Sequence, residues 1–250
     1  MNPHRARGVP FLLPRFLCPQ PLDTSNYAGY DGEWITNLFN VQDALQRETL
    51  RHDTREAILD AAQRLLTRYG YGKMTMSDLA QEAGIGVGTT YLHFPGKAQV
   101  ALAVVTRENL RVVAEQRKIA ASSAPVTSRL RNVLTIRVLM RFERIRQQKH
   151  SLAELKPAIQ QQKGLAEQAA AWREQEAQIV VALLREGTER GEFEISDAES
   201  TAGAMLWATE ALLPRNLRQQ DLEPPYLVPE RAHGIVTLLM RAVERREPGA

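Results

Sequence analysis

The chain has 250 residues, of which 44% are hydrophobic, so it can bury a substantial core in one medium domain or two small ones. Its formal net charge of +3 is too small to establish nucleic-acid binding by itself, its single cysteine excludes an internal disulfide, and no apolar run reaches the roughly 20 residues of a membrane helix. The five histidines are scattered, and there is neither a phosphate-binding glycine loop nor a nucleophile elbow, so we expect no metal, no cofactor and no enzyme activity.

Residues 1–50 differ in composition from the rest of the chain. Prolines interrupt the first part at Pro3, Pro10, Pro14, Pro19 and Pro21. Prolines and an arginine also break the one apolar patch, residues 9–17, which disfavours a signal peptide. Residues 33–48 have a weakly helical pattern. We interpret residues 1–50 as an N-terminal extension that is disordered or weakly helical; an added regulatory element and sequence upstream of the true start are the alternatives.

A first amphipathic helix is expected from Asp53 to Tyr69. Asp53 can cap the free amides, and Glu56 can complete a capping box three residues later. Apolar side chains recur at helical spacing at Ile58, Ala61, Ala62, Leu65, Leu66 and Tyr69. Gly70 and Gly72 end the helix, because glycine tolerates the left-handed conformation of a C-terminal cap.

Two shorter helical patterns follow with almost no chain between them. The second helix begins after Thr75, which can form a capping box with Asp78, and it ends at Gly84. The third spans Val87 to Phe94, with Gly86 at the cap position. Three consecutive short helices with a tight turn between the last two are typical of a helix-turn-helix DNA-binding domain.

The third helix carries polar groups that can contact DNA. Hydroxyl and imidazole groups suited to base edges or phosphates belong to Thr89, Thr90, Tyr91 and His93. Gly88 leaves room for a close approach at the first turn, and either Leu92 or Phe94 must turn inward to hold the helix. Such a run taken alone is more often solvated surface, so the prediction depends on the whole pattern.

The pattern over residues 75–97 reads T-x-x-D-L-A-x-x-A-G-I-x-x-G-T-x-Y-x-x-F-x-x-K. It resembles the N-terminal domain of TetR/AcrR-type transcriptional regulators, over about a fifth of the chain. The chain departs from that family in two places. Gly86 stands where serine is usual, so no serine–phosphate contact is expected there, and Ala98 stands where an acidic residue is usual.

The resemblance implies that the third helix enters the major groove. It also implies that Thr75 caps the second helix and touches a phosphate, and that Tyr91 and Lys97 grip phosphates. The DNA-contacting residues that we expect are therefore Thr75, Val87, Gly88, Thr89, Thr90, Tyr91, His93 and Lys97.

From Ala98 onward the pattern is helical, and no alternating run is long enough for a strand. Further helices are expected over residues 98–121, 127–148, 151–162, 165–190, 196–213 and 229–243. Ser196 and Glu199 form a capping box, and Pro157 kinks its helix or marks its start. The expected fold is all-α, with the extension followed by a helix-turn-helix domain over residues 51–97 and an all-helical domain over residues 98–250.

The resemblance implies that the C-terminal domain binds a small effector and dimerises through its last two helices. Side chains compatible with such an interface are Ala204, Ala208, Ala211, Leu212, Ile235, Leu239 and Val243, although packing within one chain is the alternative. Candidates for the effector pocket are Leu134, Val138, Phe142, Trp172 and Met205, for which plain core packing is the alternative. No charged cluster stands out in the sequence, which favours a largely apolar effector.

Together these features predict a ligand-responsive transcriptional regulator located in the cytoplasm. We expect a repressor that binds a near-palindromic DNA operator as a homodimer and is released by its effector. The alternative is an all-α interaction or adaptor protein that keeps the helix-turn-helix shape without reading DNA. The sequence leaves open the operator, the effector and the regulated genes.

Overall fold

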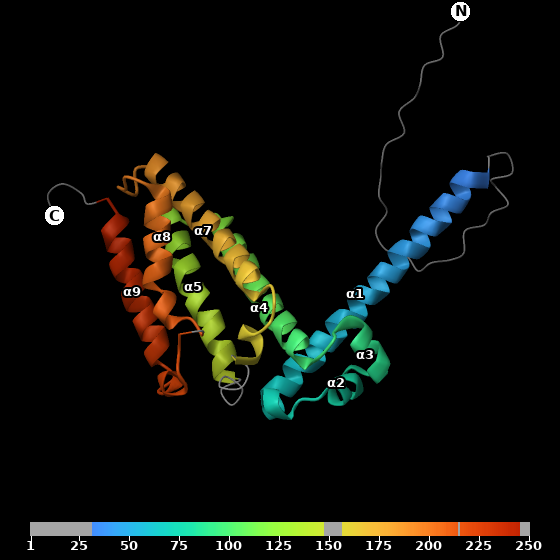
Figure 1. Ribbon diagram of the computed structural model, residues 1–250. Helices are drawn as coiled ribbons and strands as arrows, with labels where there is room; N and C mark the ends of the chain where they lie inside the picture. The colour runs from blue at the N-terminus through green and yellow to red at the C-terminus, as the bar shows by residue number, and fades with distance from the viewer. Residues whose placement is uncertain (1–31, 148–156, 215, 246–250) are drawn as a thin grey trace, which may run out of the picture. The chain divides into compact units, whose positions relative to one another are not determined.

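The computed structural model describes residues 32–147, 157–214 and 216–245 (Figure 1). Within these ranges the fold is all-α, as expected, and an isolated bridge between Phe193 and Glu244 is the one β-type pairing. The helices are α1 (Gly32–Lys73), α2 (Met76–Ala83), α3 (Val87–His93), α4 (Lys97–Ala120), α5 (Val126–Gln147), α7 (Leu165–Glu189), α8 (Ala198–Ala208) and α9 (Leu227–Val243), with short 3-10 helices η3 (Glu210–Leu212) and η4 (Gln219–Leu222). No described helix is long and apolar enough to cross a membrane.

The chain divides into two units, residues 1–49 and 50–250. In the first unit, residues 1–31 lie outside the described residues, and Gly32–Thr49 form the first part of α1. The second unit contains all the other described elements, and the contacts below lie within it.

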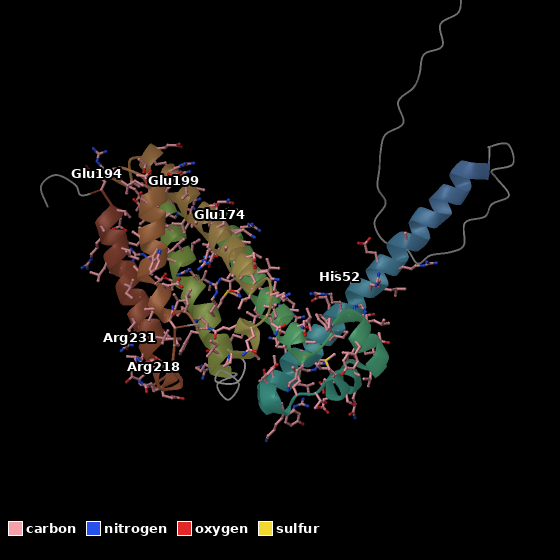
Figure 2. All side chains as sticks on the ribbon, in the orientation of Figure 1. His52, Glu174, Glu194, Glu199, Arg218 and Arg231 are labelled. Carbon is pink, nitrogen blue, oxygen red and sulfur yellow. The ribbon has the colours of Figure 1, made fainter. Side chains whose placement is uncertain are left out.

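Helix α1 begins at Gly32, so the expectation of a helix start at Asp53 is wrong. Neither glycine nor proline occurs between Glu33 and Tyr69, and nothing there interrupts the helical hydrogen bonds. Asp53 therefore lies inside the helix, next to the exposed His52 (Figure 2). At the other end, Gly70 leaves helical geometry with φ 82° and ψ 169°, where the sequence predicted the helix to end.

The first core cluster joins the first four helices. Its buried members are Ile58, Leu59, Ala62, Leu65, Leu66, Met74, Met76, Leu79, Phe94, Val100, Ala101, Leu102, Val104 and Ile159. The N-terminal half of α4 therefore belongs to the helix-turn-helix core, which extends past Lys97 to Val104. Ile159, far along the chain, closes this core from the C-terminal side.

The remaining helices build a second packed body, visible in Figure 1 as a bundle around α5. Helix α5 packs against α4, α7 and α9, and α7 also packs against α4 and α8. The main cluster includes Leu130, Leu134, Val180, Leu184, Met205, Val236 and Met240. A smaller cluster lies near the C-terminal half of α5, with Val138, Phe142, Ile145, Leu212, Leu213, Leu217, Val228 and Ala232.

Helix boundaries in this region agree with the sequence to within a few residues, with two exceptions. The cap of α8 is Asp197, whose carboxylate accepts the amide N–H of Ser200 at 2.6 Å, so the capping box expected at Ser196 is wrong. Helix α8 also stops at Ala208 and continues as η3. Of the helix expected over residues 151–162, residues 151–156 lie outside the described residues, and residues 157–160 are helical.

Candidate nucleic-acid interface

The turn between α2 and α3 is fixed by a cap at each end of α2. The amide N–H of Asp78 donates to Thr75 Oγ1 at 3.1 Å, and the amide N–H of Thr75 donates to Asp78 Oδ2 at 3.0 Å, which is the expected capping box. Gly84 ends α2 with φ 70°, a conformation that strains any residue with a Cβ atom. Gly86 then begins α3, which packs on α2.

Helix α3 presents an open outward face. Exposed fractions on it are 42% for Val87, 52% for Tyr91 and 83% for Leu92. A Cβ atom added to Gly88 would meet no atom within 4 Å, so the first turn is open to a close approach by another molecule. Thr89 and His93 are partly buried beside this face.

Thr90 is fully buried, so the expectation that its side chain faces DNA is wrong. Its hydroxyl turns back toward the carbonyl of Gly86, at 3.5 Å. Thr90 and Phe94 are four residues apart and therefore share the inward face of α3, where Phe94 is 4% exposed. Leu92, two positions from each, must then point outward; this spacing could have identified it as a surface residue of α3.

Lys97 is held by the end of α1. Its ammonium Nζ donates to the carbonyls of Tyr71, Gly72 and Met74, each at 3.3 Å, and lies 4.7 Å from the centre of the Tyr71 ring. Carbonyls at the end of a helix lack intrahelical donors, and a cation there is favourable. The expectation that Lys97 extends toward a phosphate is therefore not met by the described chain.

Comparison with known proteins agrees with this geometry. Residues 58–104 match the family of bacterial regulatory proteins, tetR family. Over these residues the chain is similar to that family. A stretch of 96 residues is 27% identical to the HTH-type transcriptional repressor KstR of Mycolicibacterium smegmatis, and it covers 38% of this chain and 47% of that repressor. The chain thus spans about half the length of this curated relative.

Solved structures share the fold over most of the chain. A TetR/AcrR-family regulator from Thermobifida fusca superposes with a TM-score of 0.58 at 22% identity, covering 77% of this chain and 100% of that one. FadR from Bacillus subtilis, solved in complex with stearoyl-CoA, has a TM-score of 0.54 at 19% identity, covering 76% of this chain and 99% of that one. These regulators do not form an enzyme class.

Several basic side chains of the TetR-type domain are paired internally. Arg64 Nε donates to Glu82 Oε1 at 2.6 Å, and Arg68 lies 3.8 Å from the other oxygen of that carboxylate. The hydrogen bond from Arg64 holds the pKa of Glu82 below its ordinary value. Arg55 lies over the ring of Phe94, 5.2 Å from its centre. These contacts hold α1 against α2 and against Phe94 at the end of α3.

The TetR-type domain is tied to the following helices through α4. Arg107 of α4 donates to Glu56 at 3.1 Å and to Asp60 at 2.7 Å, both on α1. Thr106 of α4 donates from its hydroxyl to Gln168 Oε1 of α7 at 2.8 Å. One helix therefore bonds to the helix-turn-helix domain and to the C-terminal bundle over adjacent residues.

The five pocket candidates are all buried, but they do not form one group. Leu134 and Met205 belong to the main cluster of the C-terminal bundle. Val138 and Phe142 belong to the smaller cluster. Trp172 is buried on α7, one helical turn before Glu176. Ordinary core packing accounts for the first four, and their lining of one effector pocket together with Trp172 stays a prediction.

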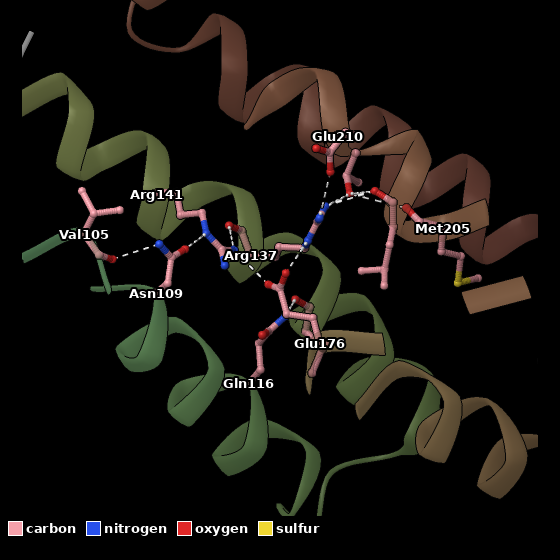
Figure 3. Close-up of polar contacts among 11 residues, drawn as sticks. Val105, Asn109, Gln116, Arg137, Arg141, Glu176, Met205 and Glu210 are labelled. Carbon is pink, nitrogen blue, oxygen red and sulfur yellow. Dashed lines mark hydrogen bonds and ion pairs between the residues drawn. The ribbon is translucent and has the colours of Figure 1, made fainter. Parts of the chain in front are cut away.

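A buried charged cluster, which the sequence pattern did not reveal, lies at the centre of this bundle (Figure 3). Arg137 of α5 is 1% exposed and donates to Glu176 at 3.3 Å and to Glu210 at 3.2 Å. Arg141, one turn later, donates to the other oxygen of Glu176 at 2.9 Å and to Asn109 of α4 at 2.9 Å. The expectation that no charged cluster is present is therefore wrong. The sequence did not indicate the cluster because its members lie far apart along the chain.

The outward surface of α8 and α9 combines small and large apolar side chains. Ala204, Ala208 and Ala211 are exposed, as an interface would require. Trp207 and Leu238, which were not among the predicted interface residues, are 79% and 66% exposed. The sequence feature that could have indicated these two residues is their position on the two helices that were predicted to dimerise.

Two of the expected interface residues face inward instead. Leu212 is 5% exposed in the smaller cluster, and Val243 is 4% exposed in the main cluster. Ile235 and Leu239 are partly buried against these same clusters. The expectation that Leu212 and Val243 are interface residues is therefore wrong, because packing within the chain takes up both side chains.

Proposed function

We propose that the protein is a ligand-responsive transcriptional repressor that binds a near-palindromic operator as a homodimer. The observation that carries this proposal is the open outward face of α3, the second helix of a helix-turn-helix. In such domains this helix lies in the major groove of DNA. Tyr91 and Leu92 stand on that face, while Thr90 and Phe94 anchor the helix from behind.

Contacts to DNA are assigned by their position. Thr75 is exposed at the start of α2, where the first-turn amides outside the capping box suit a phosphate. Its hydroxyl reaches a phosphate in this proposal only by giving up Asp78 Oδ2, to which it donates at 2.7 Å. Tyr91, Thr89 and His93 supply polar groups of α3, and the open backbone at Gly88 allows a close approach. Lys97 reaches a phosphate in this proposal only by giving up its carbonyl acceptors.

In the proposed homodimer, the second copy of the chain binds to the exposed surface of α8 and α9. Trp207 and Leu238 are largely exposed apolar side chains on these two helices, and the alanines beside Trp207 permit close helix approach. A two-fold dimer places two copies of α3 about one turn of DNA apart, or a multiple of it, which explains the expected near-palindrome.

Ligand response is assigned to the link through α4. The N-terminal half of α4 is part of the DNA-binding core, and its later residues Val112 and Val113 are buried farther along. A ligand that favours one position of α4 changes the separation of the paired α3 helices, and DNA weakens ligand binding by the same factor. FadR, which shares the fold, was solved with stearoyl-CoA, and KstR is a repressor; both support this proposal.

The test is selection of DNA fragments by the purified full chain, followed by a gel shift of the selected sequence at several salt concentrations. A repressor selects a near-palindrome, and its affinity falls steeply as salt rises. Binding without sequence preference, or no binding at all, favours the alternative of an interaction protein with a non-reading helix-turn-helix.

A further inference from the structure

Three arginines form a row along one side of α5. Arg137, Arg141 and Arg144 are separated by four and then three residues, so their side chains leave the helix on the same face. That face is turned toward α4 and α7, because Arg141 bonds to Asn109 of α4 and to Glu176 of α7. The row therefore runs inside the C-terminal bundle.

Negative charge matches only the first part of this row. Glu176 is 2% exposed and is shared between Arg137 and Arg141, and Arg137 also reaches Glu210. Around Arg144 the attracting carboxylate is Glu108, whose Oε1 already accepts a hydrogen bond from Arg111 at 2.9 Å.

The Nε atom of Arg144, the inner nitrogen of its guanidinium group, is buried and has no hydrogen-bond acceptor among the described residues. Burial lowers the pKa of Arg144, and the positive charge of Arg141 lowers it further. Arginine nevertheless stays charged in proteins, so its neighbours cannot remove the charge by deprotonating it. The Arg144 side chain is partly buried, and a guanidinium whose inner nitrogen is buried without an acceptor is an unfavourable arrangement that calls for a ligand or another functional use.

A buried indole lies on the face of α7 that is turned toward α5. Trp172 is 9% exposed and lies one turn before Glu176, so both side chains leave α7 on the same face. The planar guanidinium of arginine matches the two oxygens of a carboxylate, and a buried indole suits an apolar chain or ring.

As part of the ligand-responsive function proposed above, on which this rests, we propose that the effector is an amphipathic carboxylate. Arg144, next to Arg141, binds the carboxylate, and Trp172 contacts the apolar body. This assignment keeps the effector largely apolar and adds the anionic group that the sequence did not suggest. It names Arg144 as the residue that distinguishes a carboxylate from a neutral molecule of the same shape.

The first measurement needs no ligand. Arg144→Met keeps the length of the side chain and removes its charge, so it should raise the melting temperature of the free full chain by at least about 2 °C. Arg146→Met is the matched control, because Arg146 lies on the same helix but is exposed and pairs with Glu143 at 2.8 Å. A melting temperature of Arg144→Met that falls clearly below that of the control would show a structural cation and overturn the proposal.

The second measurement compares carboxylates with their alcohols. Hexanoate, decanoate and phenylacetate are titrated against hexanol, decanol and 2-phenylethanol, with thermal shift and calorimetry on the chain without DNA. We expect at least one carboxylate to bind the parent and Arg146→Met, and to bind Arg144→Met at least about tenfold more weakly, as the loss of a charge-assisted hydrogen bond implies. An equal response of the parent and Arg144→Met, including no response by either, overturns the proposal.

These two measurements are independent of operator binding. If the chain selects no DNA sequence, the proposed repressor fails while the carboxylate site still stands or falls on its own titration. If the chain selects an operator, the binding carboxylate should release it from the parent but not from Arg144→Met. If the carboxylate releases neither the parent nor Arg144→Met from the operator, the carboxylate site has no regulatory role, and its assignment as the effector site is overturned.

Discussion

Arg107 of α4 donates from Nη1 to Asp60 of α1 at 2.7 Å, across the base of the helix-turn-helix. The Arg107 side chain is only 11% exposed, and its second terminal nitrogen reaches Gln63 of α1 at 2.9 Å. Helices α1 and α4 also share one apolar core. A displacement of α4 must therefore carry α1 with it or break these bonds, which makes Arg107 a natural point of control for any signal that travels along α4.

Replacing Arg107 by methionine should lower the free energy of unfolding by about 1–3 kcal/mol, the range for hydrogen bonds to charged groups. The lower half of this range applies if solvent around the exposed Asp60 screens the pair. Urea unfolding measures the change. Arg111→Met is the control, since Arg111 is 54% exposed in a pair with Glu108 and should cost only a few tenths of a kcal/mol. Equal losses for both variants would contradict a special role for Arg107.

The helix-turn-helix was predictable because its signals are local. The box of Thr75 with Asp78 spans three residues, and Gly84 needs only its own backbone freedom to end α2. The orientation of Thr90 was also within reach, because its four-residue spacing from Phe94 places both on one face. The prediction of Asp53 as an N-cap is wrong because an N-cap needs non-helical residues before it. Residues 33–52 are helical and contain no helix breaker.

The buried charges were not predictable for the opposite reason. Arg137 donates to the hydroxyl of Thr209, 72 residues away along the chain, and Lys97 reaches back 26 residues to Tyr71. Helical periodicity assigns a side chain to a face but does not identify what lies opposite. An arginine in an amphipathic pattern is ordinarily interpreted as a surface residue, and only the packing of α4, α7 and α9 around α5 shows that these arginines are not on the surface.

Tyr91→Ala should weaken binding to the selected operator by about 1–3 kcal/mol, the scale of a good polar contact in a protein–DNA interface. The melting temperature should hardly change, because Tyr91 is 52% exposed. Thr90→Val is the neighbouring control: its side chain is fully buried, so its operator affinity should stay close to that of the parent. Unchanged operator affinity in Tyr91→Ala would remove Tyr91 from the interface.

Leu92 should contact the methyl group of a thymine. It is 83% exposed on α3, and an apolar side chain in the major groove pairs best with that methyl group. Replacing single thymines of the selected operator by deoxyuridine removes only the methyl group and should cost the parent about 0.8 kcal/mol at one position. Leu92→Ser should bind the two operators equally. If no thymine position distinguishes the parent from Leu92→Ser, Leu92 reads no methyl group.

Trp207→Asp and Leu238→Asp should each convert the proposed dimer into a folded monomer. Both side chains are largely exposed in the single chain, so a charge there disturbs the interface while leaving the fold intact. Sedimentation equilibrium measures the mass, and circular dichroism checks the fold. Leu110→Asp serves as the control, because Leu110 is 47% exposed but lies on α4. A monomeric parent at micromolar concentration would rule out this interface.

Acid should destabilise the C-terminal bundle partly through Glu186. Arg129, 7% exposed, bonds to the carboxylate of Glu186 and donates to the carbonyls of Ala120 and Ala124, so one guanidinium joins α7 to the connection between α4 and α5. The hydrogen bond from Arg129 holds the pKa of Glu186 below its ordinary value of 4.5. Because the folded-state pKa is the lower one, this stabilisation is fully present above the unfolded-state pKa and is lost as the pH falls through the folded-state pKa.

Glu186→Gln removes that titration. The variant should melt at a lower temperature than the parent at pH 7. The difference in melting temperature should shrink as the pH falls below about 4.5, because the Glu186 carboxylate of the unfolded parent then takes up a proton that the folded parent binds only at still lower pH. Melting curves from pH 7 to about 3 measure it. Glu189→Gln, an exposed change three residues later on α7, controls for the loss of one negative charge. A constant difference between parent and Glu186→Gln over the whole range would show that the contact with Arg129 does not depend on the charge of Glu186.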